Sequence, residues 1–335
     1  MNVPFQKIFC VKRKMNMEER KVKTNDIYEK LSANISKVIS GKNDVIRKVI
    51  ITMLCGGHVL LEDMPGTGKT TLAKSLALSC DGDFRRVQFT PDLLPSEVTG
   101  LRYFNQKEGE FVFGKGAVFT NILLADEINR ATPRTQSSLL ECMEERQVSE
   151  SGTTYKLDRP FMVIATQNPV ETQGTFPLPE AQLDRFFMKL SMGYPSFDSE
   201  IEMLKNHGYS NPVSELTPVV TRDEIIAAQD EIRMIKVSDD IMKYIMTIVK
   251  ATRENDSVKA GVSPRGALAL LSAVKGWAAA AGRDYAEPDD VKAVAEDVLS
   301  HRLIMKRLSA DRNESARMVI RAVLSNTEVP SEQEI

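Results

Sequence analysis

The chain has 335 residues, of which 42% are hydrophobic and 27% are charged, as in an ordinary globular protein. This length exceeds the size at which a single core usually stops growing, so two domains are expected. The formal net charge of −2 argues against a chain that coats nucleic acid, and no apolar run reaches the roughly 18 residues that span a membrane.

Residues 1–24 carry an excess of lysine and arginine, which predicts a basic extension outside the folded core. This arm could touch a membrane or an acidic partner, but its composition favours disorder. The four cysteines of the chain have no Cys-x-x-Cys spacing, and only three histidines accompany them. We therefore expect reduced cysteines in a cytoplasmic protein rather than a metal site.

Between residues 26 and 54, apolar residues recur at helical spacing with a break at residues 40–43, which predicts two helices. Short apolar runs then predict buried strands at residues 58–61, 86–89, 122–125, 162–165 and 187–190. Because these runs are apolar throughout and alternate with helices, they indicate a parallel sheet between layers of helices. The predicted fold class is α/β, with a nucleotide-binding core over residues 25–195.

Two segments of this core, residues 101–113 and 148–157, alternate in polarity around short turns and predict β-hairpins. Long insertions of this kind are often functional, although they can also be surface ribbons.

The pattern changes after residue 195. A capping box at Thr221, a serine cap at Ser263 and a proline start at Pro288 each predict a helix, and no strand pattern follows. Residues 196–335 are therefore expected to form an all-helical domain of about five helices.

The segment from Leu60 to Thr71 reads LLEDMPGTGKTT and has the order strand, glycine-containing loop, helix. In this arrangement backbone N–H groups converge on an anion at a helix N-terminus. Lys69 would reach the β- and γ-phosphates, and Thr70 would offer its hydroxyl to Mg²⁺. The usual pattern opens with glycine, where this chain has Asp63. The predicted nucleotide-binding residues of the loop are Pro65, Gly66, Thr67, Gly68, Lys69, Thr70 and Thr71.

The predicted strand at residues 122–125 is followed by two acids, Asp126 and Glu127. Asp126 is predicted to hold Mg²⁺, mostly through water, because this ion dehydrates reluctantly. Glu127 is predicted to polarise the water that attacks the γ-phosphorus. Asn168 ends a strand expected beside the phosphate loop and could hold the same water, or could belong to an Asn-Pro turn.

Two arginines are further candidates for catalysis. Arg185 stands between apolar residues just before a strand, and Arg265 lies in the first turn of a helix. A cation in that turn opposes the helix dipole unless an anion is near. Each arginine could pair with a surface acid, or could stabilise transition-state charge as an arginine finger.

The order of these motifs resembles that of the AAA+ ATPases, and specifically the MoxR family. The resemblance covers roughly residues 30–305 and rests on the phosphate loop and on residues 124–131, 165–169, 183–186 and 263–268. It implies that ATP is the nucleotide, that Lys69 and Thr70 belong to Walker A, and that Asp126 and Glu127 form Walker B. Asn168 would be sensor 1.

The resemblance also implies contacts between subunits. Arg185 would reach the neighbouring subunit's site as the arginine finger, whereas Arg265 would act within its own subunit as sensor 2. Arg130 and Arg134 are further candidates for contacts across the subunit boundary. A site that needs its neighbour's arginine is complete only in an oligomer, and this family forms hexameric rings.

The segment from Val38 to Gly41 would lie against adenine, and the two hairpins would correspond to the helix-2 insert and the pre-sensor-1 hairpin. The family's proteins are chaperone-like ATPases that remodel or mature client proteins, including metal-cofactor insertion, with partners that carry a von Willebrand factor A domain. The alternatives are the ATPase subunit of a metal chelatase, a scaffold that barely hydrolyses nucleotide, and a nucleic-acid translocase. A translocase would need basic hairpin tips, but Glu108 and Glu110 accompany Lys107 and Lys115.

Overall fold

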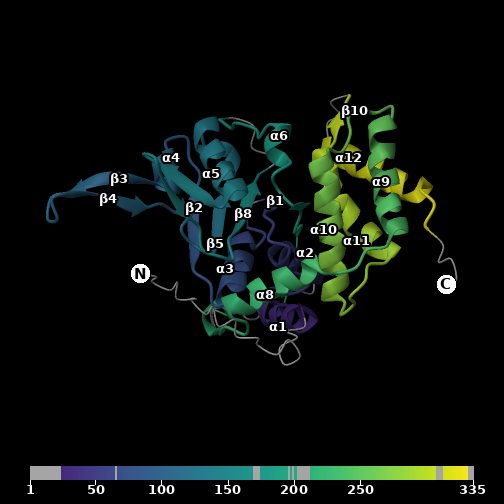
Figure 1. Cartoon of the computed structure of the whole chain (residues 1–335), viewed down its shortest axis with the longest axis horizontal. Coiled ribbons are helices and arrows are strands. Elements are labelled where there is room, and N and C mark those ends of the chain that lie inside the picture. Colours follow the sequence, from purple (N-terminus) through teal and green to yellow (C-terminus); the bar gives the residue numbers. More distant parts are fainter. Residues whose placement is uncertain are drawn as a thin grey trace, which may run out of the picture.

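Figure 1 presents a computed structural model of the chain, which describes residues 24–64, 66–168, 174–194, 197, 200–201, 212–306 and 312–330. A part built around a five-stranded sheet lies beside a part made mostly of helices. This architecture confirms the predicted α/β fold class with a helical lid. The basic extension, the predicted site residue Pro65 and the predicted boundary at residue 195 lie outside the described residues.

The sheet has the strand order β2-β5-β8-β1-β9, and every neighbouring pair is parallel. Its strands are β1 (Val59–Glu62), β2 (Phe84–Gln88), β5 (Ile122–Asp126), β8 (Met162–Gln167) and β9 (Met188–Leu190). In a parallel sheet all carboxyl ends meet at one edge. The phosphate loop after β1 and the two acids at the end of β5 therefore share that edge.

Successive residues of the central strands enter two different hydrophobic cores. Leu61 and Leu124 pack in the larger core with α1, α2 and α3, whereas Leu60 and Leu123 pack in the smaller core with α5. Burial on both faces explains why these strands read as uninterrupted apolar runs. The helices of this part are α1 (Thr24–Ser36), α2 (Asn43–Leu54), α3 (Lys69–Ser79), α4 (Pro95–Thr99), η1 (Ile128–Arg130), α5 (Pro133–Glu145) and α6 (Glu180–Leu183).

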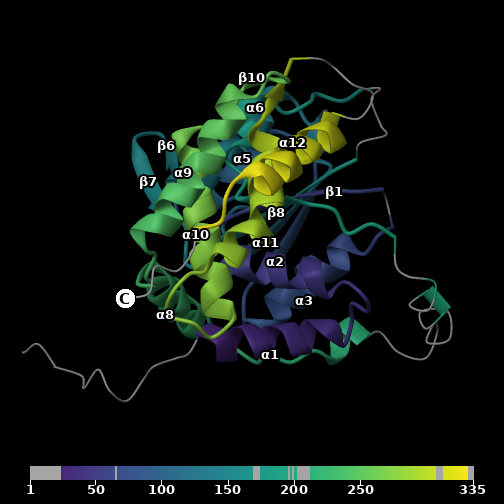
Figure 2. The same cartoon turned by 90° about the vertical axis from the view of Figure 1, so that its right-hand side faces the viewer.

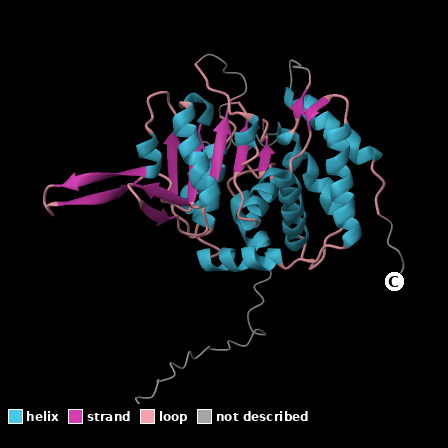
Figure 3. Cartoon of the chain, turned by 45° about the horizontal axis from the view of Figure 1, so that its top comes forward, coloured by secondary structure: helices cyan, strands magenta, loops and turns pink. Residues whose placement is uncertain are grey.

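Both predicted hairpins are present. The first pairs β3 (Gly100–Asn105) with β4 (Glu110–Lys115) and forms an arm that extends away from the body, as Figure 3 shows. Aromatic side chains on this arm face solvent, including Phe111 with 63% of its surface exposed. The second pairs β6 (Gln147–Glu150) with β7 (Thr153–Lys156).

A ring contact joins the two hairpins. Phe113 of β4 stacks on Tyr155 of β7 with 4.0 Å between ring centroids and an interplanar angle of 11°. Phe113 also makes an edge-to-face contact with Phe119, which follows the arm in the chain. The base of the arm is therefore packed against the second hairpin, although its tip is exposed.

The second part contains η2 (Pro212–Glu215), α8 (Arg222–Arg233), α9 (Asp239–Glu254), α10 (Pro264–Ala280), α11 (Pro288–Leu299), η3 (Ser300–Arg302) and α12 (Arg312–Asn326). The predicted caps are confirmed: Thr221 accepts from the Glu224 amide, Ser263 accepts from the Gly266 amide, and Pro288 begins α11. The expectation of helices alone was incomplete. β10 (Val258–Ala260) and β11 (Ile304–Met305) form an antiparallel pair too short to give a periodic signal.

Helix α8 packs on the core as well as on the rest of the lid. Figure 2 shows α8 beside α1 at the bottom of the view, and α8 also contacts α2 and α10. The larger hydrophobic core accordingly contains residues of both parts, such as Ile225 and Leu270. The lid and the core therefore share buried surface.

Two further properties of the described residues concern membrane-crossing helices and cysteine chemistry. None of their helices combines the length and apolar character needed to cross a membrane. Cys55, Cys80 and Cys142 are free thiols, and burial raises the pKa of each to about 12. These cysteines therefore stay protonated and unreactive at neutral pH.

Candidate active site

The phosphate loop adopts the backbone conformation that its glycines permit. Gly66 and Gly68 have φ values of 82° and 91°, and Gly68 directly precedes α3. A side chain in this left-handed region would be strained, so glycine is required at both positions. The loop consequently delivers the chain to the N-terminus of a helix, where free N–H groups and the helix dipole favour a phosphate.

The Lys69 side chain folds back over this loop. Its Nζ donates to the backbone oxygens of Asp63 and Met64 at 2.8 and 3.2 Å. The ammonium is thus held inside the loop by weak neutral acceptors, which a phosphate would replace with charged ones. Thr70 and Thr71 follow in the first turn of α3, and Thr67 is buried in the loop.

The structure explains the aspartate that opens the loop. The buried Asp63 carboxylate accepts hydrogen bonds from Ser191 Oγ (2.7 Å), Met192 N (2.6 Å) and Gly193 N (2.9 Å). These donors lie in the segment that leaves β9. Asp63 therefore fixes the phosphate loop to that segment, a task that glycine could not perform.

The segment predicted to lie against adenine forms the turn between α1 and α2. Gly41 has φ 72°, and the next residue, Lys42, donates from Nζ to the Tyr194 oxygen at 2.5 Å. Tyr194 closely follows the donors that bind Asp63. The structure thus brings the Gly41 turn and the phosphate loop to the same stretch of chain.

The carboxylate predicted to hold Mg²⁺ is engaged by two side chains. Asp126 Oδ1 accepts from Thr166 Oγ1 at 2.6 Å, and Asp126 Oδ2 accepts from Arg86 Nη2 at 2.7 Å. The carboxylate and the Thr70 hydroxyl are the hard oxygen donors that Mg²⁺ prefers, so these residues fit this ion. Arg86 on β2 was not predicted, because its guanidinium meets Asp126 only through strand pairing.

Glu127 is held in an unusual conformation beside this carboxylate. Its φ of 55° is rare for a residue with a side chain and costs about 1–3 kcal/mol. The Glu127 amide donates to Thr166 Oγ1 at 2.8 Å, and its Oε2 accepts from Gln88 Nε2 at 2.6 Å. Arg130 approaches the same oxygen, with its Nε at 3.1 Å. The side chain predicted to activate water is therefore oriented by a neighbouring strand.

Asn168 directly follows β8 and is buried. β8 pairs with β1 up to the register Glu62 with Gln167. Asn168 therefore stands one residue beyond the paired strands, at the same edge as the phosphate loop. This position agrees with the prediction of a polar residue beside the loop.

The two candidate arginines share one acid. Arg185 Nε lies 3.2 Å from Glu144 Oε2, and Arg265 Nη2 binds Glu144 Oε1. Their side chains are 30% and 49% exposed. Arg134, in the first turn of α5, is exposed and is not part of this cluster.

This cluster lies at the opposite edge of the sheet from the phosphate loop. The oxygen of Met143, the residue before Glu144, is bound by His58 Nε2 at 3.1 Å. His58 directly precedes β1, whereas the loop directly follows β1, and a strand of four residues is about 13 Å long. We call the side with Gly66–Thr71, Asp126, Glu127 and Asn168 the phosphate edge, and the side with Glu144, Arg185 and Arg265 the arginine edge. The structure does not bring Arg265 to the phosphate loop of its own chain.

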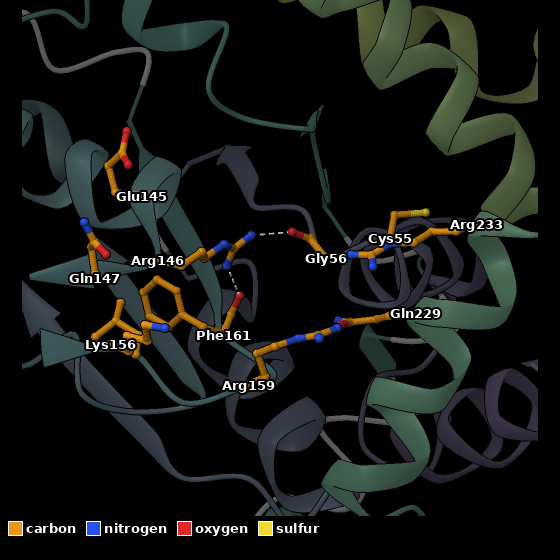
Figure 4. A pocket seen from close by; sticks show the side chains of 11 residues that line it. Cys55, Gly56, Glu145, Arg146, Gln147, Lys156, Arg159, Phe161, Gln229 and Arg233 are labelled. Atoms are coloured by element: carbon orange, nitrogen blue, oxygen red, sulfur yellow. Dashed lines mark hydrogen bonds between the residues drawn. The ribbon is translucent and has the colours of Figure 1, made fainter. Parts of the chain in front are cut away.

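A cavity of about 460 Å³ near this second edge is shown in Figure 4. Arg146 crosses it and binds backbone oxygens of Phe161 and Gly56. Burial, together with nearby Arg159, lowers the pKa of Arg146 to about 10. Arg146 thus joins three loops at the base of the sheet, and this cavity is distinct from the nucleotide site.

The fold and the phosphate edge define an AAA+ ATPase. Residues 58–188 match the ATPase family associated with various cellular activities (AAA), and residues 250–323 match the AAA lid domain. The chain belongs to the MoxR family within this class.

The relatives of the chain support both the class and the family. The chain is 38% identical to Chaperone MoxR1 of Mycobacterium tuberculosis, over 90% of this chain and 82% of that protein. It is 47% identical to the YeaC protein of Bacillus subtilis, over 89% of this chain and 93% of the relative. The crystal structure of a candidate ATPase from Cytophaga hutchinsonii superposes with a TM-score of 0.84 at 39% identity, covering 92% of this chain and 96% of that one.

Proposed function

We propose that this ATPase binds ATP and Mg²⁺ at the phosphate edge and uses hydrolysis to remodel client proteins or complexes. The observation that carries the proposal is the placement of the Walker acids. Glu127 is held by Gln88 and Thr166 beside the metal-binding carboxylate of Asp126, at the edge where the phosphate loop ends. A scaffold that only binds nucleotide has no need for a strained, oriented glutamate.

Within this site each residue has a separate task. The backbone of Gly66 to Gly68 and the Lys69 ammonium bind the phosphates, and Thr70 with Asp126 holds Mg²⁺. The bound ion supplies neutralisation of the phosphate charge. Glu127 accepts a proton from the attacking water, and the Asn168 amide orients that water.

The site becomes complete only with an arginine from a second copy. No arginine of the arginine edge reaches its own phosphate loop, because the sheet separates the two edges. We infer that Arg185 and Arg265 both serve the nucleotide of the neighbouring subunit in a ring, taken to be hexameric. For Arg265 this replaces the expectation of a role within its own subunit, and Gly41 keeps its expected place near adenine.

The arm formed by β3 and β4 is the proposed contact with clients. Its exposed aromatic side chains, Tyr103, Phe104 and Phe111, offer apolar surface to a protein chain. The relative named Chaperone MoxR1 agrees with work on proteins. A partner with a von Willebrand factor A domain, insertion of a metal cofactor and a cytoplasmic location complete the proposal.

The experiment is nucleotide-dependent capture with the Glu127→Gln variant. This variant should bind ATP with Mg²⁺ while its turnover falls by about 10²–10³-fold, which prolongs client-bound states. We expect it to retain a von Willebrand A-domain protein with its complex. Normal turnover by Glu127→Gln would disprove the assigned base, and capture of nucleic acid or of a chelating subunit would disprove protein remodelling.

Two controls make the result specific. Lys69→Ala should retain nothing, because it cannot load ATP. The pair Phe104→Ser and Phe111→Ser should keep ATPase activity and lose the client. Equal capture by either control would place the client contact elsewhere.

A further inference from the structure

A buried arginine of the lid joins the arginine edge. Arg302, in η3, is 8% exposed, and its guanidinium reaches the loop that carries Arg185. Its Nε donates to Asp184 Oδ1 at 2.7 Å, and its Nη2 donates to the Phe186 oxygen at 2.7 Å. Further bonds run to the oxygens of Phe187 and Val298. One side chain of the lid thus holds both flanks of Arg185.

Asp184 extends the same connection to α10. Its second carboxylate oxygen accepts from Ser263 Oγ at 3.1 Å, and Ser263 caps the helix that carries Arg265. Asp184 is therefore bonded both to Ser263, which caps α10, and to Arg302 of η3. The carboxylate also balances the buried guanidinium, which would otherwise be an uncompensated charge.

The start of α10 is packed closely against Arg302 at Gly266. A side chain at Gly266 would come within 2.8 Å of Arg302 Cδ and within 2.6 Å of Val262 Cγ1. Arg302 consequently lies directly against the turn that presents Arg265. The loop of Arg185, the start of α10 and η3 are therefore joined by direct contacts.

We propose that Arg302, paired with Asp184, is the positioning residue that presents Arg185 and Arg265 together to the nucleotide of the neighbouring subunit. Arg302 is buried and does not contact the phosphates. It acts by fixing the two guanidiniums side by side, where Glu144 holds them in the single chain. This inference rests on the proposed action of Arg185 across the subunit boundary.

Mixed rings test the proposal. Arg302→Met alone should lower turnover at least tenfold while the variant still binds ATP in its own loop. Mixing it with Glu127→Gln should restore part of the turnover, because a base from one subunit then meets correctly presented arginines from the other. Absence of rescue would overturn the proposal, since it would place the defect within the variant's own nucleotide site.

Two reference mixtures separate this inference from the proposed function. Arg185→Ala with Glu127→Gln should recover turnover, and Lys69→Ala with Glu127→Gln should not, because both changes spoil the same site. If the Arg185 mixture fails, the action across the boundary is wrong. If it succeeds and the Arg302 mixture fails, only the role of Arg302 is wrong.

Further variants guard against simple misfolding. Asp184→Asn keeps the shape of the loop and removes the charge, so it should reproduce the rescue pattern if Arg302→Met does not fold. Arg317→Met removes a lid arginine that pairs, among the described residues, with Glu296 and Asp297, and it should keep turnover. Arg302→Met added to the double variant Arg185→Ala/Arg265→Ala should cause no further loss, and an additional tenfold loss would show that Arg302 does not act through these two arginines.

Discussion

The two edges of the sheet carry opposite halves of one reaction and are built in different ways. The phosphate edge depends on a backbone loop, whose glycines have positive φ before α3, and on two acids at the end of β5 that residues of neighbouring strands hold. The arginine edge depends on side chains from α5, the loop before β9 and the lid, joined by ion pairs. The phosphate edge is therefore formed by the core alone, whereas the arginine edge depends on how the lid packs on the core.

The most complete loss of function is expected at the phosphate edge, because no later step can occur without ATP binding. Lys69→Ala removes the only charged group that the loop offers to the phosphates, so ATP affinity should fall by roughly 100-fold or more. Titration with a fluorescent ATP analogue measures this loss. Lys74→Ala, on the exposed face of α3, is the matched control and should bind normally. Equal weakening by both changes would mean that charge near α3, rather than the loop lysine, determines affinity.

Changes at the arginine edge should lower ATP turnover without loss of ATP binding. Arg265→Ala and Arg185→Ala should each lower turnover by about 10³-fold, the range of an arginine finger, while ATP affinity stays near normal. Rescue of Arg265→Ala by Glu127→Gln in mixed rings is expected if Arg265 serves the neighbour. If Glu127→Gln rescues Arg185→Ala but not Arg265→Ala, Arg265 acts within its own subunit.

The link between the phosphate loop and β9 should affect stability. Asp63→Gly leaves the buried Met192 amide and the partly buried Gly193 amide without their acceptor, so we expect a loss of about 3 kcal/mol in unfolding free energy. Thermal unfolding with and without ATP measures it. Asp63→Asn should lose less, and Glu108→Ala in the exposed arm should change nothing. A stable Asp63→Gly variant would show that water replaces the carboxylate.

The smallest expected effect is a pH dependence of stability. Burial, followed by the charges of Arg146 and Arg302 respectively, lowers the pKa of His58 and His301 well below 6.5. The unfolded chain therefore binds protons that the folded chain does not, and stability falls as the pH drops through about 6.5. The loss at pH 5.5 should be about 1.4 kcal/mol for each histidine. Denaturant unfolding between pH 7.5 and 5.5 checks this, and a flat profile would contradict it.

The sequence could indicate the phosphate edge because each of its motifs is a short stretch of chain. Gly66 and Gly68 require their conformation wherever the fold places them, and Asp126 and Glu127 end a recognisable strand. Glu144 could not be found in this way, since 121 residues separate it from Arg265. Arg86 likewise meets Asp126 across 40 residues through strand order. The choice of an ion-pair partner depends on packing, which no local pattern contains.

The stack of Phe113 on Tyr155 has a mechanical consequence. β7 leads within a few residues into β8, and Asn168 directly follows β8, so the phosphate edge and the base of the arm are connected through one strand. The arm is six residues long on each side, or about 20 Å. Because the stacked rings lie at the base of the arm, any tilt there would move the tip farther than the base.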